Sequence, residues 1–193
     1  PWLGMPIAEL SALKSVLIVG STLRKDHPLI ANRLRQSAKR GLQVNVVNPM
    51  DDDWLMKVAN KAIVAPNQIA DMLAQILKAV AEAKQVAVPT VAANITVSDS
   101  VRKIAATLTE KENAAVLLGN LSQHAPNYSS LYILAQQIAQ LSGAKFGLLG
   151  EAANSVGAHI AKATPTGKGL NAAQMFAQPR KAYVLLGVEA ELD

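Results

Sequence analysis

The fold of this chain is determined by one stretch, VLIVGSTLRKDHPLIANRLRQSAKRGLQVNVVNP, residues 16–49. It begins with an apolar run that stops at Gly20, continues through a polar turn into an amphipathic helix, and ends with a second expected strand, the valine-rich Val44–Val47. A strand that is apolar at successive positions is buried on both faces, as in parallel sheets. A helix between two such strands supplies the right-handed crossover that makes them parallel. The stretch therefore predicts a parallel sheet covered by helices.

The same pattern returns later in the chain. Ala115–Gly119 repeats the apolar run with its terminal glycine, and a turn, a helix and the strand Lys145–Leu149 follow it. Tyr183–Gly187 repeats the run once more, and we expect a third strand of this kind there. The predicted fold class is α/β, a Rossmann-like three-layer α/β/α arrangement with a mostly parallel sheet and two similar strand-turn-helix-strand units. In open sheets of this class, ligands bind at the carboxyl ends of the strands.

The remaining segments complete one expected domain. Asp51–Asp53 are expected to open a helix that runs to Val58, because acidic side chains stabilise the amino end of a helix. Residues 81–98 are rich in alanine and valine and are expected to form a variable connection between the two halves. We expect residues 1–193 to be a single α/β domain. Since the sequence begins at Pro1 without an initiator methionine, we expect it to be a fragment of a longer subunit.

The composition excludes several kinds of chemistry. The 193 residues are 50% hydrophobic and 17% charged, and none is a cysteine. Disulfides, cysteine zinc sites, thiolate nucleophiles and cysteine-bound iron–sulfur clusters therefore have no ligands within these residues. The longest apolar runs are the length of strands and fall short of the ~20 residues that a membrane helix needs. We accordingly expect no direct insertion into a membrane.

Positive charge is concentrated in one segment. Between Arg24 and Arg40 there are six basic residues and one acidic residue, Asp26. Such a segment is either a solvated helix face or a surface for phosphate, nucleic acid or an acidic partner. Aromatic residues make up 4% of the chain, and none lies among these charges as a stacking platform for single-stranded nucleic acid requires. We expect no nucleic-acid partner, and the partner of the helix at residues 29–40 stays open.

The sequence contains no arrangement of residues typical of a catalytic or metal site. The three histidines are separated, without the spacing of a helical metal site, and carboxylates are not grouped near them. The dinucleotide fingerprint is incomplete, because STLRK follows Gly20 where further glycines belong, and the second strand ends in the neutral Asn48 where an acid would bind a ribose. We therefore expect no catalytic residue, no metal ligand, and a nucleotide pocket retained in shape only. The candidate residues of this vestigial pocket are Gly20, Ser21, Thr22, Asn48, Gly119 and Asn120.

Residues 16–49 resemble the repeated unit of the molybdopterin oxidoreductase superfamily. In that unit a strand ends in glycine, a polar loop leads to His-Pro, a helix ends in a basic residue and glycine, and the next strand ends in Asp-Pro-Arg. AVLLGNLSQHAPN at residues 115–127 and GAKFGLLGEAANSVGA at residues 143–158 resemble later segments of the same family. The chain departs from the family at residues 48–50, where NPM replaces Asp-Pro-Arg, and it has no cysteine to bind molybdenum.

More narrowly, three segments, VGSTLRKDHPLIANRLRQ, NPMDDD and GEAANSVGA, are similar to the G-subunit family of bacterial NADH-quinone oxidoreductase, respiratory complex I. This resemblance implies a structural domain of a subunit that carries electrons from NADH through iron–sulfur clusters to quinone. It implies no catalysis and no cofactor in these residues, with the clusters in a portion that precedes Pro1. The implied partners are other subunits of the hydrophilic arm, and the implied location is cytoplasmic, peripheral on the inner face of the bacterial inner membrane.

Two alternatives remain open. The chain could be a domain of a molybdenum oxidoreductase that still binds molybdopterin guanine dinucleotide or another nucleotide at the glycine turns. The hydroxyl and amide groups of Ser21, Thr22, Asn48 and Asn120 would then line the pocket. It could also be an unrelated α/β module, such as the central domain of thiamine-dependent enzymes, and a strand order unlike that of the superfamily would favour this interpretation.

Overall fold

The computed structural model describes residues 2–151, 154–189 and 191. The chain divides into two compact units, Pro1–Ser155 and Val156–Asp193, and each is described by itself. All five strands of the described sheet belong to the first unit. The second unit contains α8 (Ala172–Ala177) and all but the first residue of α7 (Ser155–Ile160).

Five parallel strands form one sheet in the order β3-β2-β1-β4-β5. The strands are β1 (Ser15–Val19), β2 (Gln43–Asn48), β3 (Asn60–Ile63), β4 (Ala114–Leu118) and β5 (Lys145–Leu148). β1 pairs with β2 on one side and with β4 on the other, so that Val16 lies beside both Val44 and Ala115. This order confirms the predicted α/β class, with its two similar strand-turn-helix-strand units side by side.

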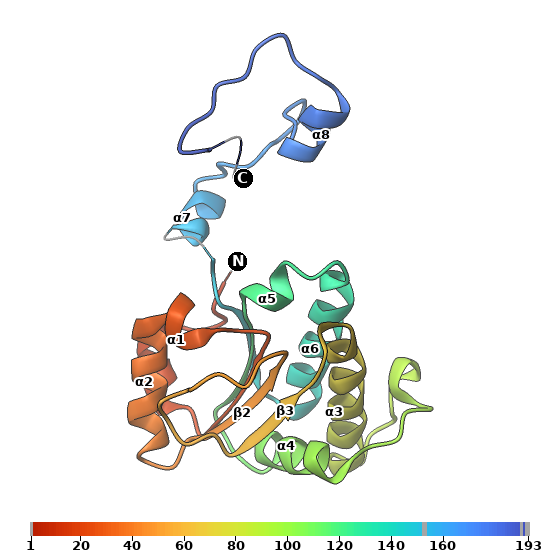
Figure 1. The fold of residues 1–193 in the computed structure, drawn as a ribbon. Coiled ribbons are helices and arrows are strands. Elements are labelled where there is room, and N and C mark those ends of the chain that lie inside the picture. The colour runs from red at the N-terminus through yellow and green to blue at the C-terminus, as the bar shows by residue number, and fades with distance from the viewer. Residues whose placement is uncertain (1, 152–153, 190, 192–193) are drawn as a thin grey trace. The chain divides into compact units, whose positions relative to one another are not determined.

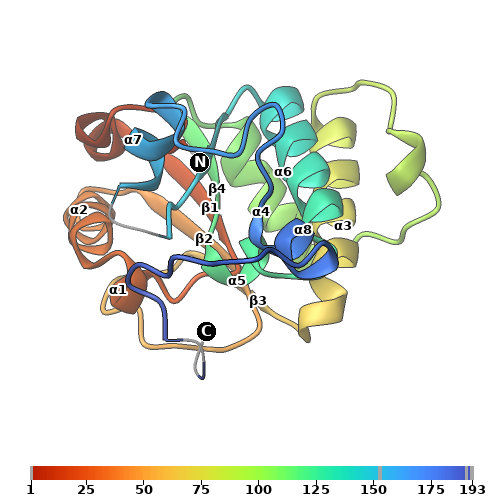
Figure 2. The same cartoon turned by 90° about the horizontal axis from the view of Figure 1, so that it is seen from above.

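Helices cover both faces of the sheet (Figure 1). One face carries the segments η1 (Ile7–Ala12), α1 (Leu23–Asp26) and α2 (Pro28–Ala38). The opposite face carries the longer helices α3 (Ile69–Ala83), α4 (Asp99–Thr109) and α6 (Tyr128–Ser142). Figure 2 shows these two helical layers with the strands between them. The remaining short helical turns of the first unit are η2 (Pro66–Gln68), η3 (Thr90–Ala92) and α5 (Asn120–Gln123).

None of the described helices combines the length and the apolar character that a membrane-spanning helix requires.

The apolar run of the first strand is buried on both sides. Leu17 and Val19 of β1 pack in the core formed with α3, α4 and α6, whereas Val16 and Ile18 pack in the core on the side of α2. All four side chains are completely buried. Burial of an aliphatic side chain contributes about 1.5–3 kcal/mol. A strand without a polar face is therefore stable only at the centre of a covered sheet, which is where β1 lies.

The helix predicted after Asp51–Asp53 is wrong, because the chain forms a loop there. The Asp52 carboxylate accepts a hydrogen bond from the Asp53 amide at 2.9 Å, and the Asp53 carboxylate accepts one from the Leu55 amide at 2.9 Å. Short acidic side chains compete in this way for backbone amides and favour turns. Trp54, which is buried, packs into the core on the α2 side and anchors the loop.

The third strand predicted at Tyr183–Gly187 is also wrong, because this run has no regular secondary structure. Val184 is 96% exposed and Leu186 is 92% exposed. A strand is stabilised by backbone hydrogen bonds to a neighbouring strand. Within the described part of Val156–Asp193 no strand is present to supply them. The apolar pattern is therefore not sufficient for a strand here.

The connection between α3 and α4 occupies residues 84–98 and contains η3, because residues 81–83 of the predicted connection belong to α3. The Lys78 ammonium on α3 donates to the carbonyl oxygens of Ala93 and Ile95, at 2.9 Å and 2.8 Å. Val88, Ile95 and Val97 also pack against the core on the side of α3. These contacts fasten the connection to the layer of helices.

A buried polar network joins the sheet to α4. Asn45 of β2 is completely buried, and its Nδ2 donates to the Thr107 hydroxyl of α4 at 2.8 Å and to the Val16 carbonyl of β1 at 3.3 Å. Its Oδ1 accepts a hydrogen bond from Nδ2 of Asn60 in β3 at 2.8 Å. Since a buried amide is costly unless it is hydrogen-bonded, this residue fixes three strands and one helix relative to one another.

Replacing Asn45 tests the network. We expect Asn45→Ala to lower the free energy of unfolding by about 2 kcal/mol, because the hydrogen-bonding groups of Thr107 and Asn60 lose a partner. The change can be measured by urea denaturation followed by circular dichroism. Asn32→Ala, on the exposed side of α2, is the matched control and is expected to change stability by no more than about 0.7 kcal/mol. Equal losses in the two variants would contradict the role of Asn45.

Candidate functional site

The direction of the chain connections reverses between β1 and β4, at the centre of the sheet. β1 leads through α2 to β2, and β4 leads through α6 to β5 on the other side. In open α/β sheets, ligands bind in the crevice outside the carboxyl ends of two such strands. The turns after β1 and β4 are therefore the first place to look for a site.

The six residues of the predicted vestigial pocket lie at this edge of the sheet. They follow or end three strands: Gly20, Ser21 and Thr22 come after β1, Asn48 is the last residue of β2, and Gly119 and Asn120 come after β4. Since β2 and β4 both pair with β1, the three strand ends are neighbours. The structure thus brings the candidate residues to one edge, and their contacts show what they do there.

The two glycine turns contact each other. A Cβ atom added at Gly119 would lie 2.3 Å from Cβ of Ser21 and 2.5 Å from the Gly20 carbonyl oxygen. A Cβ atom added at Gly20, which has a φ of +59°, would lie 2.2 Å from the Ser122 hydroxyl oxygen. Only glycine fits at such a close approach. Here each glycine makes room for the opposite turn.

Ser122 fastens the two turns together. Its hydroxyl donates to the Val19 carbonyl oxygen at 3.0 Å, and its amide donates to the Gly20 carbonyl oxygen at 3.4 Å. The Gly119 amide donates to the same Val19 carbonyl at 2.8 Å. Sequence reasoning missed this residue, because a serine in a short helix after a strand carries no signal for a contact with a residue 103 positions away.

The side chain of Asn48 also forms hydrogen bonds within the chain. It is completely buried, its Oδ1 accepts a hydrogen bond from the Ser21 amide at 2.9 Å, and its Nδ2 donates to the Met50 carbonyl oxygen at 3.0 Å. A side-chain amide can accept and donate at the same time, whereas an ionised carboxylate can only accept. The neutral Asn48 at the end of β2 can therefore bind both a backbone amide and a backbone carbonyl, which a carboxylate could not.

Four buried polar atoms near this edge have no hydrogen-bond partner in the described structure. They are the hydroxyl oxygen of Ser21, Oδ1 of Asn120, Nε of Arg24 and Nδ1 of His27. Unpaired buried polar atoms are uncommon and call for an explanation. Thr22 differs from them, because its hydroxyl donates to the Asp26 carboxylate at 2.5 Å.

The turn histidines of the two repeats hold the loop that follows β5. Nε2 of His27 is 2.8 Å from the Gly150 carbonyl oxygen, and Nε2 of His124 is 2.9 Å from the Glu151 carboxylate. Gln123 donates to the Leu149 carbonyl oxygen at 2.7 Å. The loop therefore lies against the turns of both repeats and further encloses this edge of the sheet.

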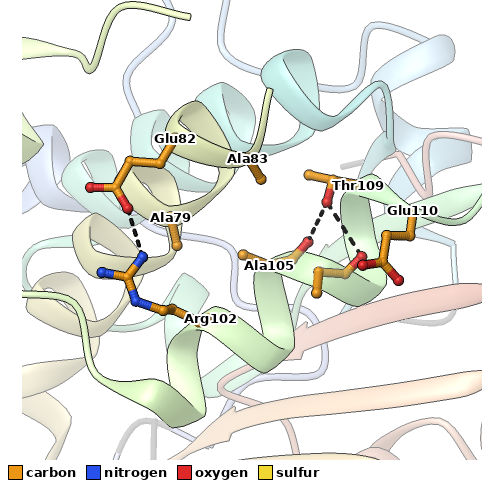
Figure 3. Close-up of a pocket in the computed structure, with 8 residues that line it drawn as sticks. Ala79, Glu82, Ala83, Arg102, Ala105, Thr109 and Glu110 are labelled. Carbon is orange, nitrogen blue, oxygen red and sulfur yellow. Dashed lines mark hydrogen bonds and ion pairs between the residues drawn. The ribbon is translucent and has the colours of Figure 1, made fainter. Parts of the chain in front are cut away.

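A hollow of about 330 Å³ lies elsewhere, between α3 and α4 (Figure 3). Alanines form much of its lining, and the ion pair between Glu82 and Arg102, at 2.7 Å, lies on one side. The Thr109 hydroxyl, which also lines it, donates to the Ala105 carbonyl oxygen at 3.0 Å. Glu82 and Arg102 thus bind each other and Thr109 binds a backbone carbonyl, which leaves Glu110 as the other charged residue of the lining.

The described residues contain no group of three or more His, Cys, Asp or Glu side chains that could hold a metal ion. Burial, together with the nearby Tyr132, raises the pKa of the Tyr128 phenol above its usual value. A phenol with a raised pKa stays protonated at neutral pH. Tyr128 is therefore not a base for proton abstraction under these conditions.

A comparison with protein families relates this chain to known proteins. A family model described as molybdopterin oxidoreductase matches residues 1–192. A search of the curated proteins gave no match. The matched range includes both glycine turns and all six candidate residues.

The contact between the turns can be tested with two glycine variants. Gly119→Ala is expected to lower the free energy of unfolding by about 3 kcal/mol, because the new methyl group must push the Ser21 turn away. Gly143→Ala, at a φ of +77° with open space around it, bears only the conformational cost of about 1 kcal/mol. Thermal and urea denaturation measure both. A loss at Gly119 no larger than that at Gly143 would show that the turns are apart.

Proposed function

The chain belongs to the molybdopterin oxidoreductase family, and we propose that it is a structural domain with no cofactor and no catalysis of its own. We further propose that it is part of the G subunit of a bacterial NADH-quinone oxidoreductase, respiratory complex I. The other subunits of the hydrophilic arm are then its partners. Its place is on the cytoplasmic side of the membrane, to which it is attached only through the complex.

The contact between the Gly20 and Gly119 turns is the observation that carries this proposal. The family implies a molybdopterin guanine dinucleotide, whose nucleotide part would need the crevice between β1 and β4. In this chain the crevice is closed by direct contact of the turns and by the hydroxyl of Ser122. The groups present therefore do not fit the cofactor, and no reaction step is assigned to it.

The residue types at the end of β2 support the same proposal. A carboxylate would accept hydrogen bonds from a ribose, and an arginine would bind a phosphate with two parallel hydrogen bonds. In this chain the position of the carboxylate is taken by Asn48, whose side-chain amide is hydrogen-bonded to the backbone of Ser21 and Met50. The position of the arginine is taken by Met50. A thioether offers no positive charge to a phosphate.

The assignment to complex I is supported by the resemblance of residues 19–36, 48–53 and 150–158 to the G-subunit family. In that setting, electrons pass from NADH through iron–sulfur clusters to quinone. The chain has no cysteine to hold a cluster, so its contribution is to shape the subunit around the path of the electrons. A stable, fully packed sheet such as this one suits that role.

A second candidate function is nucleotide binding at the same edge. The unpaired Ser21 hydroxyl and Asn120 Oδ1 favour it, because a ligand could satisfy both. Both atoms are shielded from solvent, however, so a nucleotide could reach them only after the turns separate. The choice between the two functions is a question of whether the turns open.

Cofactor content tests the proposal. The full-length protein, purified from its own cells, is expected to contain substoichiometric molybdenum by mass spectrometry and to release no guanine nucleotide on acid treatment. The double variant Asn48→Asp/Met50→Arg, which restores the family residues, is expected to remain without cofactor because the turns still contact each other. Stoichiometric molybdenum or guanine nucleotide in the unaltered protein would establish the second candidate instead.

Assembly tests the complex I assignment separately. A tagged copy of the full-length protein is expected to purify with a membrane-attached assembly that oxidises NADH and reduces quinone, and cells without it are expected to lose this activity. A protein that purifies without cofactor but outside such an assembly would leave the structural domain intact as a proposal and overturn the complex I assignment.

A further inference from the structure

The net positive charge of this chain lies in one segment. The basic segment, residues 24–40, contains six basic residues and one acidic residue, whereas the rest of the chain has thirteen of each sign. The chain as a whole has a net charge of +5, so the basic segment accounts for all of it. The six basic residues are Arg24, Lys25, Arg33, Arg35, Lys39 and Arg40.

The fold turns this charge outward. α2 buries Ala31, Leu34 and Ser37 toward the sheet, and its two arginines, Arg33 and Arg35, are exposed. No other element of the first unit lies outside α2 (Figure 2). Leu29, near the beginning of the helix, is 80% exposed. The exposed side of α2 therefore carries Arg33 and Arg35 on its two flanks and Leu29 near its start, and Lys39 and Arg40 follow directly after Ala38. Together these residues form the outward face of α2.

These cations have no acidic partner within the described part of the chain. Elsewhere in the first unit, Lys61 pairs with Asp51 at 2.6 Å, Arg102 pairs with Glu82 at 2.7 Å, and Lys145 pairs with Glu9. Arg40, which follows α2, instead donates from Nη2 to the Ser37 hydroxyl at 3.3 Å.

Like charges also face each other on α2. Arg35 and Lys39 are four positions apart, a spacing at which equal charges repel along a helix. An anion brought by another molecule would relieve this repulsion.

We propose that the outward face of α2 is a docking surface for an acidic face of another protein in the same assembly. Arginine guanidinium groups match carboxylates with paired hydrogen bonds. Leu29 adds the apolar contact that protein interfaces contain and that phosphate backbones do not offer. Aromatic side chains for base stacking are missing from the basic segment. This proposal rests on the proposed structural role, because the partner belongs to the assembly that the domain helps to build.

Charge reversal tests the docking surface in the full-length protein. Arg33→Glu/Arg40→Glu is expected to reduce the fraction of tagged protein found in the assembly by about tenfold at physiological salt, since each new carboxylate meets an acidic partner. The matched control is Lys103→Glu/Lys111→Glu, which makes the same charge change at exposed residues of and next to α4, and it is expected to leave assembly unchanged. Arg33→Gln/Arg40→Gln, which only removes charge, should lie between them. Circular dichroism of each purified variant checks that it is folded.

Zero-length cross-linking identifies the partner's chemistry. A carbodiimide joins lysine ammonium groups to carboxylates in contact, so Lys39 is expected to cross-link to Asp or Glu residues of another subunit, and Lys103 is not. Assembly that is unaffected by charge reversal, or equal cross-linking at Lys39 and Lys103, would overturn the docking surface while leaving the structural role standing. Binding of a DNA duplex or of phosphatidylserine vesicles by the purified protein, lost on charge reversal while assembly is kept, would overturn it in favour of that ligand.

Discussion

The structure depends on the close contact of two glycine turns at the centre of the sheet. Gly20 and Gly119 let the turns after β1 and β4 approach until Cβ of Ser21 and the hydroxyl of Ser122 fill the space between them. On the proposed account, a ligand at this edge would have to displace the chain's own atoms, because β1 and β4 are paired and fully buried. One contact therefore determines both the packing of the two repeats and the state of the crevice.

Much of the fold could be predicted from the sequence, because its central strands are apolar at successive positions and each ends at a glycine. The failures have a common physical cause. The run Tyr183–Gly187 has the sequence of a strand but lacks a neighbour to pair with, and Asp51–Asp53 bind local amides rather than capping a helix. In both cases the outcome depends on partners that a short sequence window does not contain.

The candidate site, too, could be predicted from the sequence only in part. Gly20, Asn48 and Gly119 could be located because the carboxyl ends of parallel strands mark the ligand edge of this fold. The closure of that edge could not be predicted, since it depends on whether Ser122 reaches the Val19 carbonyl and whether Asn48 reaches the Ser21 amide. Such contacts follow from the packing of two distant segments and leave no pattern in either one.

We propose that this domain works through its surface. The polar groups at this edge of the sheet form hydrogen bonds within the chain, and the net positive charge lies in the basic segment, residues 24–40. A family fold that elsewhere surrounds a cofactor is, on this account, kept for its shape and for its contacts with other proteins.

Hydrogen exchange at the Ser21 and Ser122 amides, followed by NMR, tests the closed crevice most directly. These amides donate to Asn48 Oδ1 and to the Gly20 carbonyl within the contact between the turns. If the turns are closed, both amides exchange as slowly as those in the middle of β1, through the same opening of the sheet. If the turns are open, both exchange rapidly while β1 stays protected, and the central claim is contradicted.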